Sequence, residues 1–324
     1  MSKDIEAGTQ NALPFEKSSV SKAKKSKRCT GWVAPLCIIG CILVVVLLWW
    51  VISVILSSVE ASKSLKMLQQ CMNDTSLSKT TTSLIVPDDQ CNGENFKLLD
   101  LSKLKNLATL VVGDRCFRYV QKVNIRNLKQ LKTVTIGKES FTLNREWYGQ
   151  NPDFQLVLKN CPSLTRLSIG DHSFLEYTTC DLAQLPSLEI VEMGDFNSSA
   201  ESSSFYWASL SLKNLPRLKS LLLGNHAFLY AKEVVLEKLQ ELQSIQFGMN
   251  AMTFAEGSDT KLIMKELPQL TTIMAPQNST SFMNPQSVYI LNTPSVVNVS
   301  LPGAFQKKHS VTVKNIGALQ SFFE

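Results

Sequence analysis

The sequence predicts a mostly β solenoid of about nine repeats of about 24 residues, preceded by one transmembrane α-helix. Three observations predict this fold. A glycine or proline recurs at a spacing of 24 to 33 residues, apolar residues recur at fixed distances from it, and one long uncharged run lies near the N-terminus. A short period with insertions is typical of solenoids, in which each unit buries its apolar face only against its neighbours.

The apolar positions around the recurring residue predict two short strands in each repeat. They lie fourteen and twelve residues before it, and again three and one before it. Each pair has the period of two that is typical of a strand. Asparagine ten residues before the glycine predicts a turn between the strands, and the glycine itself predicts a corner. The recurring residue is Gly113, Gly137, Gly170, Gly194, Gly224 and Gly248, then Pro276 and Pro302.

A phenylalanine follows the glycine by four residues in several repeats, and we expect it to fold back into the core. It stands at Phe117, Phe141, Phe174 and Phe228. With this residue the repeat resembles leucine-rich repeats, and most closely the BspA-like variant with its I-G-x-x-[AS]-F signature. The matching segments are VTIGKESF at 134–141 and LSIGDHSF at 167–174. The resemblance covers about 97–324 and implies a leucine-rich-repeat solenoid used for binding and surface display rather than for one activity.

One stretch of the chain is long and apolar enough to span a membrane. Residues 29–59 carry no charge, and a bilayer core needs about 20 apolar residues in a helix. Five basic residues precede this run at 22–28, so the positive-inside rule places the N-terminus in the cytosol. We therefore expect a disordered basic tail at 1–28, a signal-anchor helix at 29–59, a stalk with an N-terminal cap at 60–96, and the solenoid at 97–324. The solenoid would lie outside the cytosol, and we favour the plasma membrane.

The basic tail and its neighbouring cysteine have two interpretations each. The segment SKAKKSKR orients the anchor, and it could also bind anionic lipid. Cys29 is either a palmitoylation site or a plain thiol at the membrane boundary. Beyond the tail the charge is nearly balanced, because the tail holds most of the excess of the 33 basic over the 27 acidic residues. The charge therefore gives no argument for a nucleic-acid partner.

The cysteines outside the membrane fall into two groups. Cys116, Cys161 and Cys180 stand at core positions of the repeat, where a free cysteine behaves as a small hydrophobe. Cys71 and Cys91 remain, and we expect them to form one disulfide in the cap. Four N-x-S/T sequons on the same side of the anchor agree with export and are candidate glycosylation sites: Asn73, Asn197, Asn278 and Asn298.

The sequence argues against an enzyme. It contains three histidines, no paired acidic residues that recur in one place, and no nucleophile, phosphate-loop or dinucleotide motif in a suitable context. A zinc site is not expected either, because no CxxC motif with a nearby histidine occurs. We expect no catalytic residues, no metal and no cofactor.

Two insertions lengthen the repeats and carry aromatic residues. They span 142–153 and 198–207, and we expect both to follow the phenylalanine position and to project from one edge of the solenoid. Exposed aromatic clusters on loops are typical binding anchors, and the alternative is that the second group packs as part of a strand. The candidate ligand-binding residues are Trp147, Tyr148, Phe205, Tyr206 and Trp207.

Two functions fit these features. The first is a non-enzymatic membrane protein that displays its solenoid for recognition of, or adhesion to, a protein or glycan. The second is a structural coat protein whose copies associate through the solenoid. In both cases membrane lipid is a partner through the anchor.

Overall fold

A computed structural model describes residues 33–143, 151–196, 203–257 and 259–324, with side chains from residue 39 onward. The chain divides into two compact units, Met1–Val54 and Ile55–Glu324. The predicted ligand residues Trp147 and Tyr148, the sequon residue Asn197 and the lipidation candidate Cys29 lie outside the described residues.

The N-terminal element is α1, Val33–Cys71, a helix of 39 residues. Its part from Ile39 onward is long and apolar enough to cross a membrane, and the apolar window is not buried against the protein. The helix extends beyond the expected boundary at residue 59, because its last turns pack on the solenoid. Ala61 and Leu68 are buried there, and the expected stalk is therefore helical up to Cys71.

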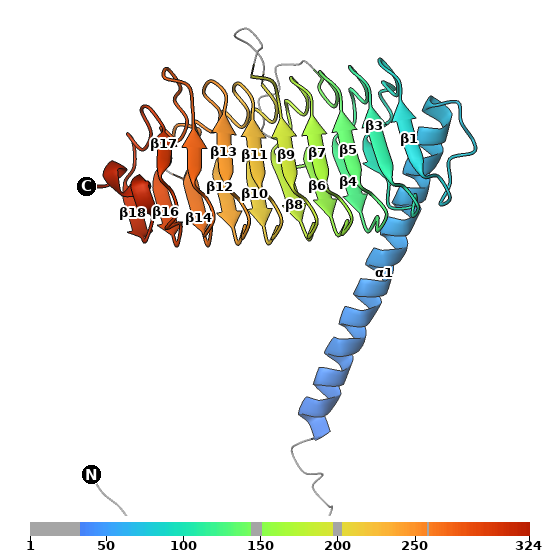
Figure 1. Ribbon diagram of the computed structural model, residues 1–324. Helices are drawn as coiled ribbons and strands as arrows, with labels where there is room; N and C mark the ends of the chain where they lie inside the picture. The colour runs from blue at the N-terminus through green and yellow to red at the C-terminus, as the bar shows by residue number, and fades with distance from the viewer. Residues whose placement is uncertain (1–32, 144–150, 197–202, 258) are drawn as a thin grey trace, which may run out of the picture. The chain divides into compact units, whose positions relative to one another are not determined.

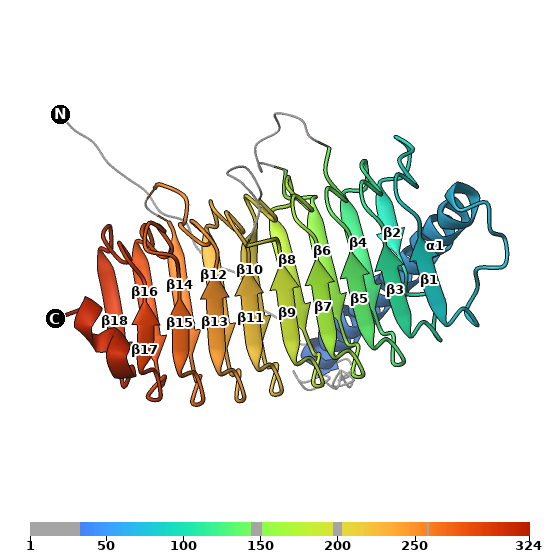
Figure 2. The same cartoon turned by 45° about the horizontal axis from the view of Figure 1, so that its top comes forward.

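The rest of the chain is a parallel β-solenoid of about eight turns of about 26 residues (Figures 1 and 2). Two nine-stranded sheets form it, and every neighbouring pair of strands within each sheet is parallel. Sheet A contains β1 Ser83–Val86, β3 Thr109–Val112, β5 Thr133–Ile136, β7 Arg166–Ile169, β9 Ile190–Met193, β11 Ser220–Leu223, β13 Ser244–Phe247, β15 Thr272–Met274 and β17 Asn298–Ser300. Sheet B contains β2 Leu98–Asp100, β4 Lys122–Arg126, β6 Gln155–Lys159, β8 Thr179–Ala183, β10 Ser209–Lys213, β12 Glu233–Glu237, β14 Lys261–Lys265, β16 Ser287–Leu291 and β18 Ser310–Lys314.

The two strands expected in each repeat are confirmed, and the chain alternates between the sheets. The solenoid begins earlier than the expected residue 97, since β1 already pairs with β3. The turns from sheet B to sheet A form one edge of the solenoid, which we call the fixed edge, because from β4 onward each turn has six residues. The connections from sheet A to sheet B form the opposite edge, the variable edge, where all the larger differences in length occur (Figure 1).

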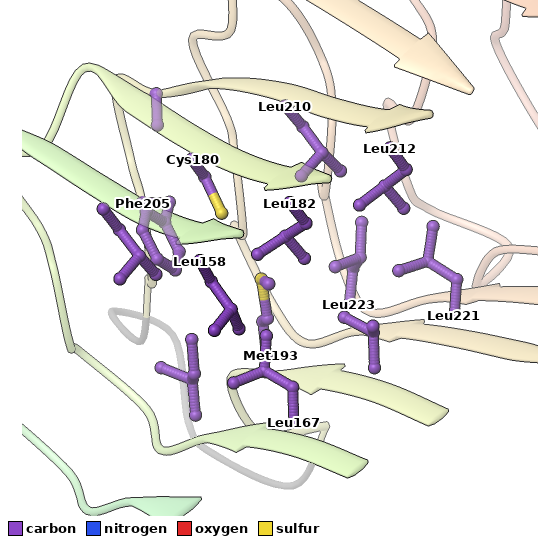
Figure 3. Packing of buried hydrophobic residues seen from close by; sticks show 14 of the residues in the cluster. Leu158, Leu167, Cys180, Leu182, Met193, Phe205, Leu210, Leu212, Leu221 and Leu223 are labelled. Carbon is purple, nitrogen blue, oxygen red and sulfur yellow. The ribbon is translucent and has the colours of Figure 1, made fainter. Parts of the chain in front are cut away.

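The core lies between the two sheets. Inward side chains of neighbouring strands meet there, as Leu210 and Leu212 of sheet B do with Leu221 and Leu223 of sheet A (Figure 3). All four are at most 1% exposed. The alternating burial along each strand is the pattern that a strand with one buried face produces. The three cysteines expected in the core, Cys116, Cys161 and Cys180, are buried and free.

A ladder of phenylalanine rings runs through the core along the variable edge. Phe141 stacks on Phe174 with ring centroids 4.6 Å apart, and Phe174 stacks on Phe205 at 4.8 Å. The four predicted members are joined by others that lie at different distances from the glycine. The eight buried members are Phe117, Phe141, Phe174, Phe205, Phe228, Phe254, Phe282 and Phe305. These residues have positive φ angles of 53° to 76°, a strain that stacking and burial of the rings offset.

The recurring glycines have a different role from the predicted one. Of the six, Gly194 alone has a positive φ, of 84°, so the others do not serve to free a corner. A Cβ atom on Gly170 would lie 2.5 Å from the carbonyl carbon of Gly137. The glycines therefore allow successive turns to approach closely. The left-handed residues of the fixed edge are instead those at the asparagine position, such as Asn214 with φ 55°, as that position's turn chemistry predicts.

The N-terminal end of the solenoid is covered, and at the C-terminal end a short helix packs beside the last strand of sheet A. At the N-terminal end the expected disulfide between Cys71 and Cys91 joins the last residue of α1 to the connection between β1 and β2. At the C-terminal end a short helix, η1 Gly317–Phe322, buries Leu319. Phe322 and Phe323 then pack against Phe305 of the ladder, with centroids 5.6 and 4.9 Å away. The sequence showed no such cap.

Candidate functional site

A cluster of three aromatic side chains lies on the variable edge. Tyr206 and Trp207 belong to the connection before β10, and Tyr230 belongs to the next connection, before β12. The two connections are neighbours because β10 pairs with β12, and the Tyr230 amide donates a 2.9 Å hydrogen bond to the Tyr206 carbonyl. All three side chains are half-buried. The solenoid step therefore brings together residues that are 23 positions apart.

The three rings contact one another directly. Trp207 stacks on Tyr230 with centroids 4.7 Å apart and an interplanar angle of 24°. Tyr206 packs edge-on against both rings, at 5.2 Å from Trp207 and 5.0 Å from Tyr230. These geometries are the favoured ones for aromatic pairs, so the cluster is a pre-arranged apolar surface with polar rims. A rigid aromatic surface of this kind loses little conformational entropy on binding a ligand.

The phenol group of Tyr206 stays neutral at physiological pH. Partial burial, then the hydrogen bond with Tyr230, raises the pKa of Tyr206 to about 12. A neutral phenol both donates and accepts hydrogen bonds. The cluster can therefore contact an apolar or sugar ring through its faces and hydroxyl groups through its rim.

The predicted ligand residues that the structure describes have two outcomes, and one residue of the cluster was not predicted. Tyr206 and Trp207 are partly accessible and adjacent, as a binding role requires. The assignment of Phe205 was wrong, because this side chain is fully buried and stacks between Phe174 and Phe228 in the ladder. Tyr230 was missed. It stands in a repeat without an insertion, and its only sequence signal was that it follows the ladder residue Phe228 by two positions, as Trp207 follows Phe205.

The burial of Phe205 also corrects the place of the second insertion. Phe205 occupies the ladder position of its repeat, so the extra residues lie before this phenylalanine. The first insertion lies after Phe141. Both belong to connections from sheet A to sheet B, but they lengthen different halves of them. The expectation that both insertions follow the phenylalanine position, from which we predicted a common binding edge, is therefore wrong.

A polar trough occupies the outer face of sheet B near its middle. It has a volume of about 660 Å³ and is lined mainly by β8 and β10, including Thr179, Ala183 and Ser211. Lys159 and Asp181 form an ion pair at its wall. A second hollow of about 580 Å³ adjoins it on the fixed edge, where Gln184 and Asn214 line both. Its floor is shaped by proline rings of successive turns: Pro162, Pro186 and Pro216.

The described residues show no group of three or more His, Cys, Asp or Glu side chains placed to hold a metal ion. Burial raises the pKa of the Cys116, Cys161 and Cys180 thiols, most strongly at Cys180. Thiols with a raised pKa are poor nucleophiles at neutral pH, which fits their packing role. The absence of catalysis stays a prediction.

Three of the candidate glycosylation sites can be placed. Asn73 lies directly after α1, Asn278 lies on the variable edge, and Asn298 begins β17 on the outer face of sheet A. All three side chains are exposed, so a glycan could be attached without disturbing the core. The described sequons leave the outer face of sheet B and the fixed edge without a candidate glycan.

Neither a protein-family model, nor a curated protein, nor a solved structure matches this chain.

Proposed function

We propose that this protein is a single-pass membrane protein that displays a leucine-rich-repeat-like solenoid for recognition of, or adhesion to, a protein or glycan. The observation that carries the proposal is α1, whose apolar window is exposed and whose last turns continue directly into the disulfide-linked first turn of the solenoid. An exposed apolar helix of this length needs a bilayer, and the solenoid then becomes the displayed part.

The relation to BspA-like repeats is part of the proposal. The signature segments 134–141 and 167–174 each contain a strand of sheet A, the closely packed glycine and a ladder phenylalanine. The isoleucine, the glycine and the phenylalanine of the signature thus each have a structural role in this solenoid. A surface role is also supported by the cap disulfide, which is typical of exported proteins.

A protease test on intact cells examines the orientation of the full chain. With the N-terminus in the cytosol, protease added outside should reach the chain beyond about residue 60, and enzymatic removal of N-glycans should increase mobility on a gel. If Asn73 carries a glycan, the substitution Asn73→Gln should make the change in gel mobility on glycan removal smaller by the contribution of one glycan. Loss of only the basic N-terminal tail under external protease would mean the opposite orientation and would contradict surface display of the solenoid.

The aromatic cluster is the proposed contact surface. We expect the double substitution Trp207→Ala/Tyr230→Ala, in the full chain in nanodiscs, to reduce binding on a glycan array or in a cell-adhesion assay by about tenfold or more. Tyr289→Ala is the matched control, because Tyr289 is a half-buried tyrosine on the outer face of sheet B. Equal binding by the double variant and the wild type would exclude the cluster as the contact surface.

One observation favours the second candidate, a self-associating coat. Among the described residues β18 pairs only with β16, so its other edge presents unpaired backbone groups, and Val311 on it is 39% exposed. Open strand edges of this kind pair readily with other chains. If copies associate here, Val311→Lys should reduce chemical cross-linking between full-length chains, whereas Val297→Lys at the exposed fixed edge should not.

A further inference from the structure

The solenoid carries unpaired positive charges beside the point where α1 joins it. Within the unit Ile55–Glu324, the Lys103 ammonium donates a 2.8 Å hydrogen bond to Ser58 Oγ of α1. Ser64 Oγ of the same helix accepts a 2.7 Å hydrogen bond from the Asp100 amide at the end of β2. The helix therefore enters this unit at the fixed edge, at the turn between β2 and β3. Val59, the last of the exposed large apolar residues of α1, follows Ser58 directly.

The first two turns of the fixed edge hold four cations and no acid, and Arg126, the last residue of β4, adds a fifth cation beside them. They are Lys103, Lys105, Arg126, Lys129 and Lys132, which we call the basic corner. All but Lys103 are exposed. None of these exposed four forms an ion pair with another described residue. Because β2 and β4 are neighbours, the two turns lie about 4.8 Å apart, and the charges form one patch.

Farther along the fixed edge such cations are fewer, and some of them are paired. Arg217 and Lys219 both pair with Glu189, at 3.3 and 3.0 Å. Exposed lysines without an ion pair among the described residues occur there singly, at Lys213, Lys238 and Lys314. Cations without an ion pair are therefore most numerous in the two turns nearest the helix. The acids close to that corner are Asp100, whose side chain accepts hydrogen bonds from Ser102 and Asn124, and Glu60, which shares its exposed part of α1 with Lys63 and Lys66.

We infer that the basic corner binds anionic headgroups in the leaflet from which α1 emerges on the solenoid side, and so holds the fixed edge against that membrane surface. The inference rests on the proposed membrane anchorage. Lys103 lies beside the end of the apolar run, which is the level at which headgroups begin. Basic residues near a membrane surface attract anionic lipid, and the attraction decreases within a Debye length, so only charges close to the helix are effective. The unpaired cations occupy that position.

Lysine acetylation of the full chain in nanodiscs tests the inference. Nanodiscs of phosphatidylcholine are compared with nanodiscs that also contain phosphatidylserine, and mass spectrometry follows each lysine. We expect Lys105, Lys129 and Lys132 to react about threefold more slowly in the anionic bilayer. Lys232, an exposed lysine of the variable edge without an ion pair among the described residues, should react equally in both. The protection should disappear in about 1 M salt, where the Debye length is about 3 Å.

Charge reversal supplies the matched variants. Lys129→Glu/Lys132→Glu should abolish the protection of Lys105, and Arg118→Glu/Lys232→Glu on the variable edge should leave it unchanged. All four positions are exposed, and unchanged thermal unfolding confirms that each variant folds. A chain that fails to enter nanodiscs would contradict the membrane anchorage itself. A chain that enters them with equal lysine reactivity in both bilayers would overturn the inference alone and would direct attention to an acidic protein partner at this corner.

Discussion

At the scale of single residues, the most informative positions are the recurring glycines. Sequence reasoning assigns a glycine at a corner to backbone freedom, because glycine adopts positive φ without cost. Among the described residues of this solenoid most positive φ angles belong to phenylalanines, asparagines and other polar residues, and five of the six recurring glycines have none. Glycine is required at these positions because the preceding turn of the solenoid lies too close for a Cβ atom. This requirement comes from how the turns stack and not from the conformation of a single turn.

Substitution Gly170→Ala tests this role. Its Cβ atom would lie 2.5 Å from the carbonyl carbon and 2.7 Å from the oxygen of Gly137, so the turns must separate. We expect the free energy of unfolding to decrease by about 1–3 kcal/mol, as for other overpacked sites, measured by chemical denaturation. Gly93→Ala is the control, because nothing lies within 4 Å of its Cβ position. Equal effects of the two substitutions would contradict a close-approach role.

At the scale of secondary-structure elements, the join between α1 and the solenoid is a built connection and not a loose stalk. The last helical turns bury Ala61 and Leu68, Ser64 bonds to the end of β2, and Cys71 is linked to Cys91. These contacts cover the apolar end of the first turn, which would otherwise face water. The same contacts fix where the helix meets the solenoid, on which the role of the basic corner depends.

Removal of the cap disulfide should loosen this end of the molecule first. In Cys71→Ser/Cys91→Ser a closed loop with a sequence separation of 20 is opened, and we expect a loss of about 3 kcal/mol in the stability of the first turns. Hydrogen exchange should become faster in β1 and β3 and change little in β14 and β16. The control removes a thiol that forms no disulfide, and Cys161→Ala is suitable because Cys161 is buried and free. Cys161→Ser is less suitable, because it would bury a hydroxyl group in the core. Unchanged exchange in β1 would show that packing alone holds the cap.

At the scale of the whole molecule, stability is distributed along one direction. Each turn contacts its neighbouring turns, and the phenylalanine ladder joins turns through ring contacts of 4.6 to 5.1 Å from Phe117 to Phe228 and of 6.0 to 6.2 Å from Phe254 to Phe305. In such an array the effect of a substitution depends on its place in the stack. The same stacking allows the variable edge to carry connections of different length, since the strands and the fixed edge keep the register.

Removing one ring from the middle of the ladder should therefore act differently from removing one at its end. We expect Phe174→Ala to cost about 3–5 kcal/mol and to speed hydrogen exchange in β4 to β10, on both sides of the gap. Phe323→Ala at the C-terminal cap should affect η1, β17 and β18 with a smaller loss. A uniform change in exchange along the chain in both variants would mean that the solenoid unfolds as one unit and not as coupled neighbours.

Much of the fold could be predicted from the sequence because each repeat states the same pattern independently. The two strand positions of Leu210 and Leu221, the asparagine turn of Asn214 and the buried Cys180 all follow from alignment of the copies. The disulfide followed in part by elimination, since the other thiols had core positions. The site was less predictable. Phe205 was wrongly placed in the insertion because position was counted from the glycine, whereas the ladder is defined by ring stacking.

The sequence by itself determined the repeated and local elements: an apolar run long enough to span a bilayer, strands whose alternation needs a core, and turns whose residues allow left-handed backbone. Those properties depend only on residues that are close together in the sequence, so the sequence pattern is enough to predict them. The tertiary structure alone decided what the stack brings together. It joined Tyr230 to Tyr206 and Trp207, it required glycine where turns touch, and it placed the basic corner beside α1. The physical reason is that all three arrangements depend on the distances between successive turns, and only the stacking of the turns sets those distances.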